Sequence, residues 1–284
     1  MAGIKVQRYV AAFVDLLGQR EALEKIELFP NTEDSENMAR FGNAVLDSVG
    51  VVKDMHDTFS QYFATISAQS PTSSLSPEQK EVTIPAIKSQ RFSDGLVFFC
   101  SLAEGVPASS VFGILAACGS SCLWQLAVKH PVRIGVDLHF GAESSECDLY
   151  GPVVANAYRL ESEIAQYPRV VVGNEVVKYL KVCADQIACG KKEAFTKDLS
   201  GYCLEMLEQD SDGHWIVDYL GSGFKRYAAH KSNADGPLAA YKFAKEQAEA
   251  FKMAQNTKLA FRYSLLLNYI EHRLPLWGVS TDNN

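Results

Sequence analysis

The amino-acid sequence predicts an α+β fold in which helices pack on a mostly antiparallel sheet. Apolar, β-prone runs alternate along the chain with longer runs of helical period. One pair of β-prone runs is joined through Ser93, Asp94 and Gly95, and Asp-Gly between such runs is a strong hairpin signal. The chain has 284 residues, of which 47% are hydrophobic and 21% are charged, so it can bury a core of ordinary size.

Each element is placed by the period of its apolar residues and by the turn residues that bound it. Asp15 ends the first strand, and one segment rich in Ser and Pro lacks any period and is expected to be a flexible loop. In chain order we expect a strand over 8–14, helices over 19–28 and 36–63, the polar loop over 67–81, strands over 82–92 and 96–100, a buried helix over 107–129, strands over 132–140 and 146–150, a helix over 151–166, a strand over 168–172, a helix over 174–180 capped by Asn174, a hairpin of 202–207 with 214–219, and a long helix over 238–270.

The charge and cysteine content exclude several classes of function. A formal net charge of -7 argues against polymeric nucleic acid as a partner, because phosphate backbones are held mainly by clustered Lys and Arg. A single nucleotide remains compatible, since two divalent cations can carry most of the charge of a triphosphate. Seven scattered cysteines without a CxxC pair, no signal-peptide pattern and no apolar stretch of membrane-spanning length favour a cytoplasmic protein without a membrane partner.

Two carboxylates stand at positions suited to metal binding. Asp15 terminates a strand that is too hydrophobic to be exposed, and Asp94 lies at the tip of the expected hairpin. In a βαββ arrangement these two points face each other. Carboxylates that converge at strand ends hold pairs of Mg²⁺ or Mn²⁺ ions, which need oxygen ligands and keep free positions for phosphates. Taken singly, an Asp before a turn and an Asp in Asp-Gly are also common structural choices.

Four segments in the right order resemble class III nucleotidyl cyclases. The resemblance implies a ferredoxin-like βαββαβ palm with added helices, and a two-metal reaction that turns a nucleoside triphosphate into a 3′,5′-cyclic nucleotide. It also implies residues 1–220 as the catalytic domain, with a polar insertion around 66–81, and residues 221–284 as a helical extension packed on it. The segments are FVDLLG at 13–18, FSDGLVFF at 92–99, VRIGVDLHFG at 132–141 and DLYGPVVANAYRLES at 148–162.

The resemblance assigns roles to residues of this chain. Asp15 and Asp94 are the implied metal ligands, with the backbone carbonyl of Leu16 as a third, and two divalent cations, Mn²⁺ or Mg²⁺, are the implied cofactors. Arg159 falls on the arginine that stabilises the transition state. The implied substrate-binding residues are Phe13, Gln90, Asp148 and Asn156.

Two of these positions depart from the family pattern. The family carries an Asn four residues before the arginine to orient the ribose, whereas this chain has Ala155 there and Asn156 one residue later. Where relatives that act on purines carry a Lys four residues before the second metal aspartate, this chain has Gln90. Gln90 both donates and accepts hydrogen bonds, so with the acceptor Asp148 it can face either uracil or cytosine.

The sequence is most similar to the bacterial Pycsar pyrimidine cyclases of antiphage defence. This resemblance implies a uridylate cyclase that converts UTP to cyclic UMP and pyrophosphate, as a second-messenger synthase whose product activates a separate effector protein. It also implies a homodimer with composite active sites, in which Asp148 and Arg159 of one subunit meet the metal aspartates of the other. The alternatives are a cytidylate cyclase acting on CTP, an adenylate cyclase, and a catalytically silent cyclase fold that binds nucleotide.

Overall fold

The computed structural model describes most of the chain. The described residues are 4–18, 35–69, 87–92, 95–103, 106–145, 148–229 and 234–279. The helix predicted over 19–28 therefore lies outside the described residues, as do most of the predicted loop over 67–81 and the residue Asp94. Residues 67–69, which were expected in that loop, are instead the last residues of a helix.

The described strands form one sheet in the order β2-β3-β1-β4-β6-β8-β7, with β5 paired to β4 beside this path. Strand β1 lies between β3 and β4 and is antiparallel to both, while β6 runs parallel to β4. The order β2-β3-β1-β4 is that of a βαββαβ palm, so the predicted α+β fold is confirmed. The strands are β1 (Lys5–Leu16), β2 (Lys88–Phe92), β3 (Gly95–Ser101), β4 (Val132–Ser145), β5 (Asp148–Tyr150), β6 (Val170–Val172), β7 (Leu207–Gln209) and β8 (Trp215–Val217).

Helices cover both faces of this sheet. The described helices are α2 (Ser35–Gln69), α4 (Pro107–Ala127), α5 (Pro152–Arg159), α6 (Asn174–Asp185), α7 (Lys191–Glu205), α8 (Ser222–Tyr227), α9 (Asp235–Met253) and α10 (Thr257–Glu271), with a π-helical turn η1 (Leu160–Ile164) and a 3-10 turn η2 (Leu274–Trp277).

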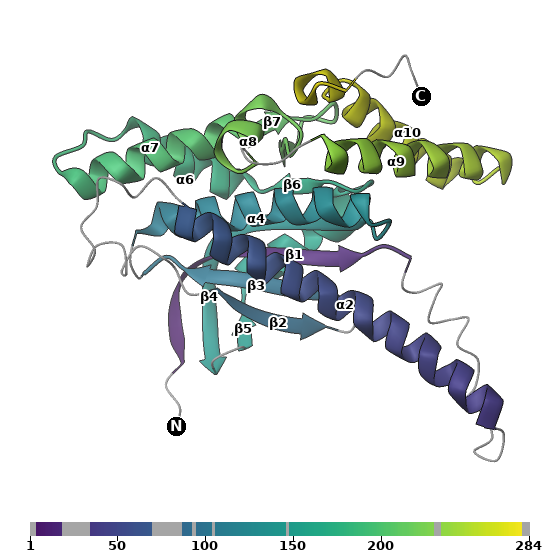
Figure 1. Ribbon diagram of the computed structural model, residues 1–284. Coiled ribbons are helices and arrows are strands. Elements are labelled where there is room, and N and C mark those ends of the chain that lie inside the picture. The colour runs from purple at the N-terminus through teal and green to yellow at the C-terminus, as the bar shows by residue number, and fades with distance from the viewer. Residues whose placement is uncertain are drawn as a thin grey trace.

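Helix α4 is the centre of the main hydrophobic core. It contacts strands β1, β3 and β4 and also helices α2, α7 and α9, and it lies in the middle of the molecule (Figure 1). Of the described helices, α4 alone has the length and hydropathy of a membrane span, and 83% of its apolar window is buried inside the protein. The apolar composition of residues 107–129 is thus explained by contacts on most sides of the helix, as predicted.

The opposite face of the sheet carries α5 and η1. Gly135 of β4 lies directly beneath them, and a Cβ atom there would stand 2.1 Å from the carbonyl oxygen of Ala157 and 2.6 Å from the backbone nitrogen of Glu161. Such distances are far inside van der Waals contact, so this position requires glycine. The close approach fixes the helix that carries Arg159 against the strand that pairs with Asp15.

The C-terminal helices differ from the prediction. The single helix expected over 238–270 is interrupted between α9 and α10, where Gln255 adopts a positive φ of 55° and the side chain of Asn256 accepts a hydrogen bond from Leu259 N at 3.2 Å. A left-handed residue followed by an Asn cap ends one helix and begins another. The apolar period continues across the break because both helices use it to face the core.

Two smaller expectations were also wrong. Residues 202–205, predicted as part of a strand, form the last turn of α7, so the hairpin arm begins only at Leu207. Asn174, predicted as a cap, is the first residue of α6, and Gly173 holds the cap position. A Cβ at Gly173 would stand 2.1 Å from the carboxylate of Asp137, so the close approach of this buried side chain selects glycine there.

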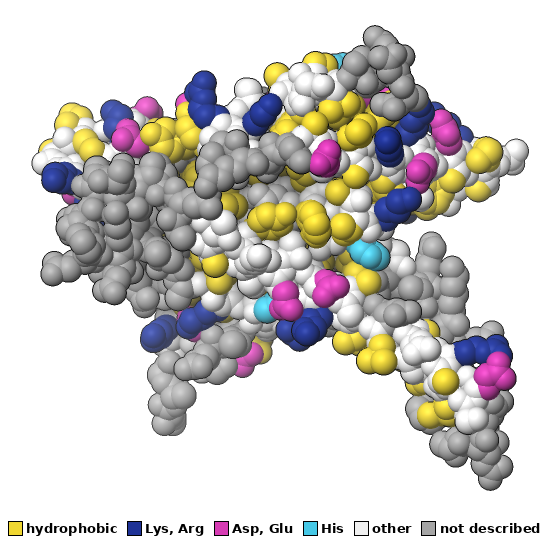
Figure 2. Space-filling view, in the orientation of Figure 1, with side chains coloured by type: hydrophobic (Ala, Val, Ile, Leu, Met, Phe, Trp, Pro, Cys, Tyr) yellow, Lys and Arg dark blue, Asp and Glu magenta, His cyan; other side chains and the backbone are white. Residues whose placement is uncertain are grey.

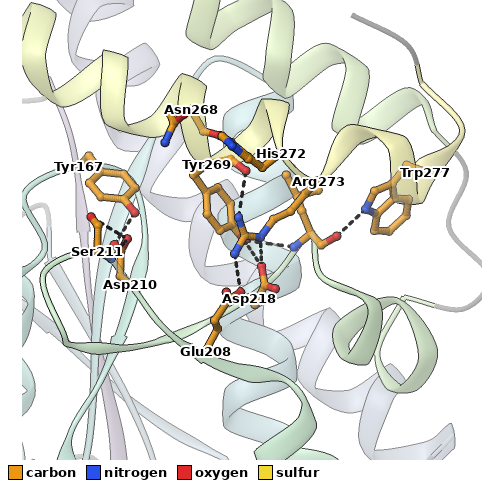
Figure 3. A network of polar contacts seen from close by, with 11 residues as sticks. Tyr167, Glu208, Asp210, Ser211, Asp218, Asn268, Tyr269, His272, Arg273 and Trp277 are labelled. Carbon is orange, nitrogen blue, oxygen red and sulfur yellow. Dashed lines mark hydrogen bonds and ion pairs between the residues drawn. The ribbon is translucent and has the colours of Figure 1, made fainter.

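The end of the chain is tied to the β7-β8 region by a polar network around Arg273 (Figure 3). The Arg273 guanidinium pairs with Asp218 and with Glu208, and the Tyr269 hydroxyl donates to Asp218 at 2.9 Å. The indole nitrogen of Trp277 donates to the carbonyl oxygen of Leu220 at 2.8 Å. These contacts, together with those between α9 and α4, hold the last two helices on the sheet domain. The boundary expected at residue 220 stays a prediction.

Charged side chains are mixed on the face shown in Figure 2. Basic and acidic side chains of the described residues alternate over the α6-α7 and α9-α10 helices, and hydrophobic side chains gather across the middle of this face. The part of the chain that the structure describes shows no continuous basic field on this side. Mixed charge of this kind is typical of an ordinary solvated surface.

Candidate active site

Side chains alternate between the two faces of strand β1, and Asp15 lies on the face that is covered by α5. Tyr9, Ala11 and Phe13 point to this face, where they form a small core with residues of β3, β5 and α5. Because side chains alternate along a strand, Asp15 continues the same series at the end of β1. Leu16 points the other way and is buried against the α4 side. A partly exposed carboxylate therefore stands at the end of an otherwise buried strand, with 24% of its side chain exposed.

Asp15 belongs to a three-residue charged group. The Arg133 guanidinium on β4 pairs with the Asp15 carboxylate at 2.9 Å and with the Glu161 carboxylate at 2.7 Å. Glu161 comes from η1, and its side chain is only 2% exposed. Burial raises the pKa of Glu161 to about 8. The negative charge of Asp15 also raises it, and the positive charge of Arg133 lowers it. One arginine side chain is thus the counter-charge for two carboxylates at a site that is largely shielded from solvent.

The register of the sheet sets Asp15 opposite the first residue of β3. Asp15 pairs with Gly95 across the β1-β3 ladder, and Gly95 directly follows Asp94 in the sequence. Asp94 itself lies outside the described residues. A Cβ at Gly95 would stand 3.2 Å from the Phe13 ring, so the glycine of the Asp-Gly pair leaves room for that aromatic side chain.

The donor chemistry around Asp15 fits a hard divalent cation. Carboxylate oxygens are the ligands that Mg²⁺ and Mn²⁺ prefer, and Asp15 offers one that is partly open to solvent. Within the described ranges no group of three or more His, Cys, Asp and Glu side chains is arranged to hold a metal ion. The carbonyl of Leu16 and the Asp94 carboxylate stay predicted ligands.

Phe13, predicted to bind substrate, is 9% exposed and lies in an aromatic cluster. Its ring stacks on Phe92 with centroids 6.2 Å apart and meets Tyr158 edge-on at 5.1 Å. Tyr158 is 53% exposed and belongs to α5. The cluster therefore joins the end of β1, the hairpin arm β2 and the helix that carries Arg159.

Gln90 and Asp148, the predicted base-reading pair, are brought together within one subunit. The Gln90 side-chain oxygen accepts a hydrogen bond from Leu149 N at 3.1 Å, and Leu149 directly follows Asp148. Because a backbone N–H can only donate, this bond fixes which end of the amide is the oxygen. The Gln90 NH₂ group is thereby left as the donor end of this amide.

Helix α5 exposes Arg159 to solvent and leaves Asn156 only partly exposed. Arg159 is exposed, and no carboxylate among the described residues pairs with it. Ala155, one turn earlier, is exposed as well, whereas the Asn156 amide hydrogen-bonds to the buried Asp137 of its own subunit. Residues four apart share a helix face, so Ala155 and Arg159 lie together and Asn156 is rotated away from them. The role expected for Asn156 in orienting ribose stays a prediction.

Sequence reasoning missed the functional neighbours Arg133 and Glu161. Both lie inside segments that carried the family resemblance, Arg133 in VRIGVDLHFG and Glu161 in AYRLES. The sequence shows an arginine within an apolar strand and a glutamate just after the α5 segment, at a position that is buried in the structure. Charged residues at positions of buried period are rarely tolerated without a partner, so the pair could have been predicted to meet.

Comparisons with known proteins give similarity at the level of the fold. No protein-family model and no curated protein sequence matches this chain. The adenylyl cyclase CyaB from P. aeruginosa is 12% identical over 63% of this chain and 83% of that one, with a TM-score of 0.40. The catalytic core of a rhodopsin-guanylyl cyclase with converted specificity, in complex with ATPαS, is 12% identical over 75% and 97%, with a TM-score of 0.38. The guanylyl cyclase domain of the RhoGC fusion protein from the aquatic fungus Blastocladiella emersonii is 12% identical over 63% and 88%, with a TM-score of 0.37.

Proposed function

We propose that this chain is a class III nucleotidyl cyclase that converts a nucleoside triphosphate into a 3′,5′-cyclic nucleotide and pyrophosphate. The observation that carries the proposal is the pairing of Asp15 with Gly95, the residue directly after Asp94. This register puts the ends of two metal-binding segments on neighbouring strands, as a two-metal site requires. The exposed Arg159 on α5 and its matched segment support the same reaction.

In this reaction the ribose 3′-oxygen forms a bond to the α-phosphorus. The bond from the α-phosphorus to the bridging oxygen breaks, pyrophosphate leaves, and the 3′-hydroxyl proton is lost to solvent. Asp15, Asp94 and the Leu16 carbonyl would hold two divalent cations, which would neutralise charge on the phosphates and activate the 3′-oxygen. Arg159 complements the negative charge that grows on the α-phosphate and the leaving group.

We assign UTP as the substrate. Gln90 offers an N–H donor, because its oxygen is engaged by Leu149 N, and Asp148 offers an acceptor. Uracil presents the matching pair, with O4 as acceptor and N3–H as donor. Cytosine presents N3 and its amino group in the reverse order, so CTP is the second candidate. A donor beside an acceptor fits both pyrimidines and also N1 and the amino group of adenine, so the choice of UTP rests on the resemblance to the pyrimidine cyclases and not on this pair alone.

The biological setting follows from the resemblance to pyrimidine cyclases of antiphage defence. The enzyme acts as a cytoplasmic homodimer with two composite sites and makes a second messenger for a separate effector.

The test is to incubate the purified full-length protein with each of the four nucleoside triphosphates and Mn²⁺, and to measure cyclic nucleotide and pyrophosphate. We expect cyclic UMP as the main product, and no product from folded Asp15→Ala or Asp94→Ala. Cyclic AMP alone would reject the pyrimidine assignment, and equal rates with UTP and CTP would reject only the uridine preference. Normal turnover in either folded aspartate variant would reject the two-metal site.

A further inference from the structure

A cavity of about 490 Å³ opens beside the turn that follows Asp15. Leu17 and Gly18 of this turn form one wall, and the segment before β4 forms the floor. Helices α9 and α10, which lie beyond the predicted catalytic domain, form the opposite wall. Lys129, Gln166 and Arg262 are among the lining residues that carry polar or charged groups.

Arg262 of α10 is the half-buried cation of this cavity. Its guanidinium donates to the Gln166 side-chain oxygen at 3.0 Å, and no carboxylate in the described part of the chain pairs with it. Burial and the neighbouring Arg133 guanidinium both lower the pKa of Arg262, although an arginine remains charged at neutral pH. Gln166, which Arg262 contacts, follows closely after η1, the turn that carries Glu161 of the charged group at the end of β1.

The charged side chains that line the cavity are all positive. Lys129 and Arg262 are its charged side chains, and none of the lining residues is acidic. Lys129 pairs with Glu246 at 3.1 Å, but both side chains are more than half exposed, so this pair is screened by water. Arg262 is the more buried of these two cations, and a partly buried guanidinium with no acidic side chain in the lining is a favourable place for an anion with several negative charges.

We propose that this cavity binds the terminal phosphates of the nucleoside triphosphate and the pyrophosphate that leaves it, with Arg262 as their ligand. This inference rests on the proposed cyclase function, because it takes Asp15 as the point where the α-phosphate is held. The phosphates beyond it then extend past Leu17 and Gly18 into the cavity. The C-terminal helices thereby contribute to substrate binding, although they carry none of the segments that resemble the cyclase family.

The position of Arg262 is held firmly enough for this role. The polar network of Arg273, Tyr269 and Trp277 ties the end of α10 and the following turn to the sheet domain (Figure 3). The Asn256 cap fixes the start of the same helix, only a few residues before Arg262. A guanidinium on a helix fixed at both ends loses little freedom when it binds a phosphate.

The test measures binding of inorganic pyrophosphate, with Mn²⁺, to the full-length protein by titration calorimetry, alongside steady-state kinetics with UTP. Arg262→Gln removes the charge and keeps a group that can hydrogen-bond to Gln166. We expect pyrophosphate to bind about tenfold more weakly, which is the loss of one charge-assisted hydrogen bond, and the KM for UTP to rise more than kcat falls. Arg262→Lys should restore part of the affinity.

Lys252→Gln is the matched control, since it removes one exposed positive charge from α9 outside the cavity. It should leave pyrophosphate affinity unchanged within about twofold. Equal affinity in Arg262→Gln and the unaltered protein, or no pyrophosphate binding by either, overturns the assignment of the cavity. If no triphosphate is cyclised and pyrophosphate binding still depends on Arg262, the cyclase assignment fails while the polyphosphate site stands.

Discussion

At the scale of single residues, the group of Asp15, Arg133 and Glu161 is the main feature of the site. Removing two carboxylates and one guanidinium from water is costly, and only their mutual pairing offsets that cost. Glu161 is the most deeply buried member, at 2% exposure. Arg133 therefore matters for the fold and for the orientation of Asp15 at once, because the same guanidinium touches both carboxylates.

At pH 9, above the folded-state pKa of Glu161 of about 8, Arg133→Met should lower the free energy of unfolding by about 3 to 5 kcal/mol, because it leaves the ionised Glu161 buried without its counter-charge. Combining it with Glu161→Gln should recover a large part of that loss, since the buried charge is then gone. Urea unfolding of the two single variants and the double variant, followed by circular dichroism, gives the coupling energy. Purely additive losses would mean that the two side chains do not act as a pair.

At the scale of elements, the packing of α5 on β4 sets the position of Arg159. Gly135→Ala should destabilise the protein by several kcal/mol and reduce cyclase activity, because its Cβ would overlap the Ala157 carbonyl oxygen. Gly42→Ala in helix α2 is the matched control, since a Cβ there meets no atom within 4 Å. It should stabilise the helix by about 0.5 to 1 kcal/mol. Thermal unfolding and turnover, measured on both variants, separate the two outcomes; a tolerated Gly135→Ala would contradict the close contact.

The β7-β8 hairpin is attached to the sheet domain through Arg169, which is 2% exposed. Its guanidinium pairs with Asp210 and Asp212 and donates to the Ile164 carbonyl oxygen at 2.6 Å. Burial alone would raise the pKa of Asp210, but hydrogen bonds from Tyr167 and Ser211 and the charge of Arg169 lower it overall, and the pKa of Asp212 is lowered as well. Both carboxylates therefore bind protons less readily in the folded state than in the unfolded state.

Because the pKa values of Asp210 and Asp212 are lower in the folded state, the stability of the fold depends on pH. The two carboxylates stabilise the fold fully above their ordinary pKa, near 4, and that contribution disappears as pH falls through the lower folded-state values. In Asp212→Asn we expect a lower Tm at neutral pH and a smaller further loss between about pH 5 and pH 2.5. Thermal unfolding at a series of pH values measures the two curves. Parallel curves for the variant and the unaltered protein would show that Asp212 does not contribute to acid unfolding.

Helices and strands were predicted correctly from the sequence where the spacing of apolar residues and the turn residues indicate the same boundaries. The β2-β3 hairpin and the apolar helix α4 were predicted from such patterns, because each is specified by residues close together in the chain, whereas the palm was predicted from the family resemblance. Residues 202–205 and the break at Gln255 were missed. The first are held in α7 by packing, and the second depends on a backbone conformation that Gln adopts only in this context.

At the scale of the whole molecule, the site could be predicted only in part. Motif resemblance led to Asp15, Gln90 and Arg159, because their positions are fixed by neighbouring residues in sequence. It could not lead to Arg262, which reaches the end of β1 only through the docking of α10. The Gln90 amide orientation likewise depends on a hydrogen bond to Leu149, which pairs residues of distant strands.

The proposed sharing of the active site between two subunits gives a prediction at the scale of the whole molecule. Mixing Asp15→Ala with Arg159→Ala should restore activity, because each mixed dimer holds one site with both residues intact. With random exchange in an equal mixture, activity should reach about a quarter of that of the unaltered enzyme. Native mass spectrometry confirms exchange, and a cyclic-nucleotide assay reads the activity. Exchange without recovery would show that each subunit builds its site alone.

Helix α4 has a further consequence while the chain is being made. Its apolar surface is covered in part by α9, which follows it by roughly a hundred residues. At about 5 to 20 residues per second, a ribosome exposes that surface for roughly 5 to 20 seconds before its cover can fold. A nascent chain in this interval displays a helix with the hydropathy of a membrane span. Production of this protein therefore depends on how fast translation proceeds beyond α4 and on chaperones that bind apolar segments during that delay.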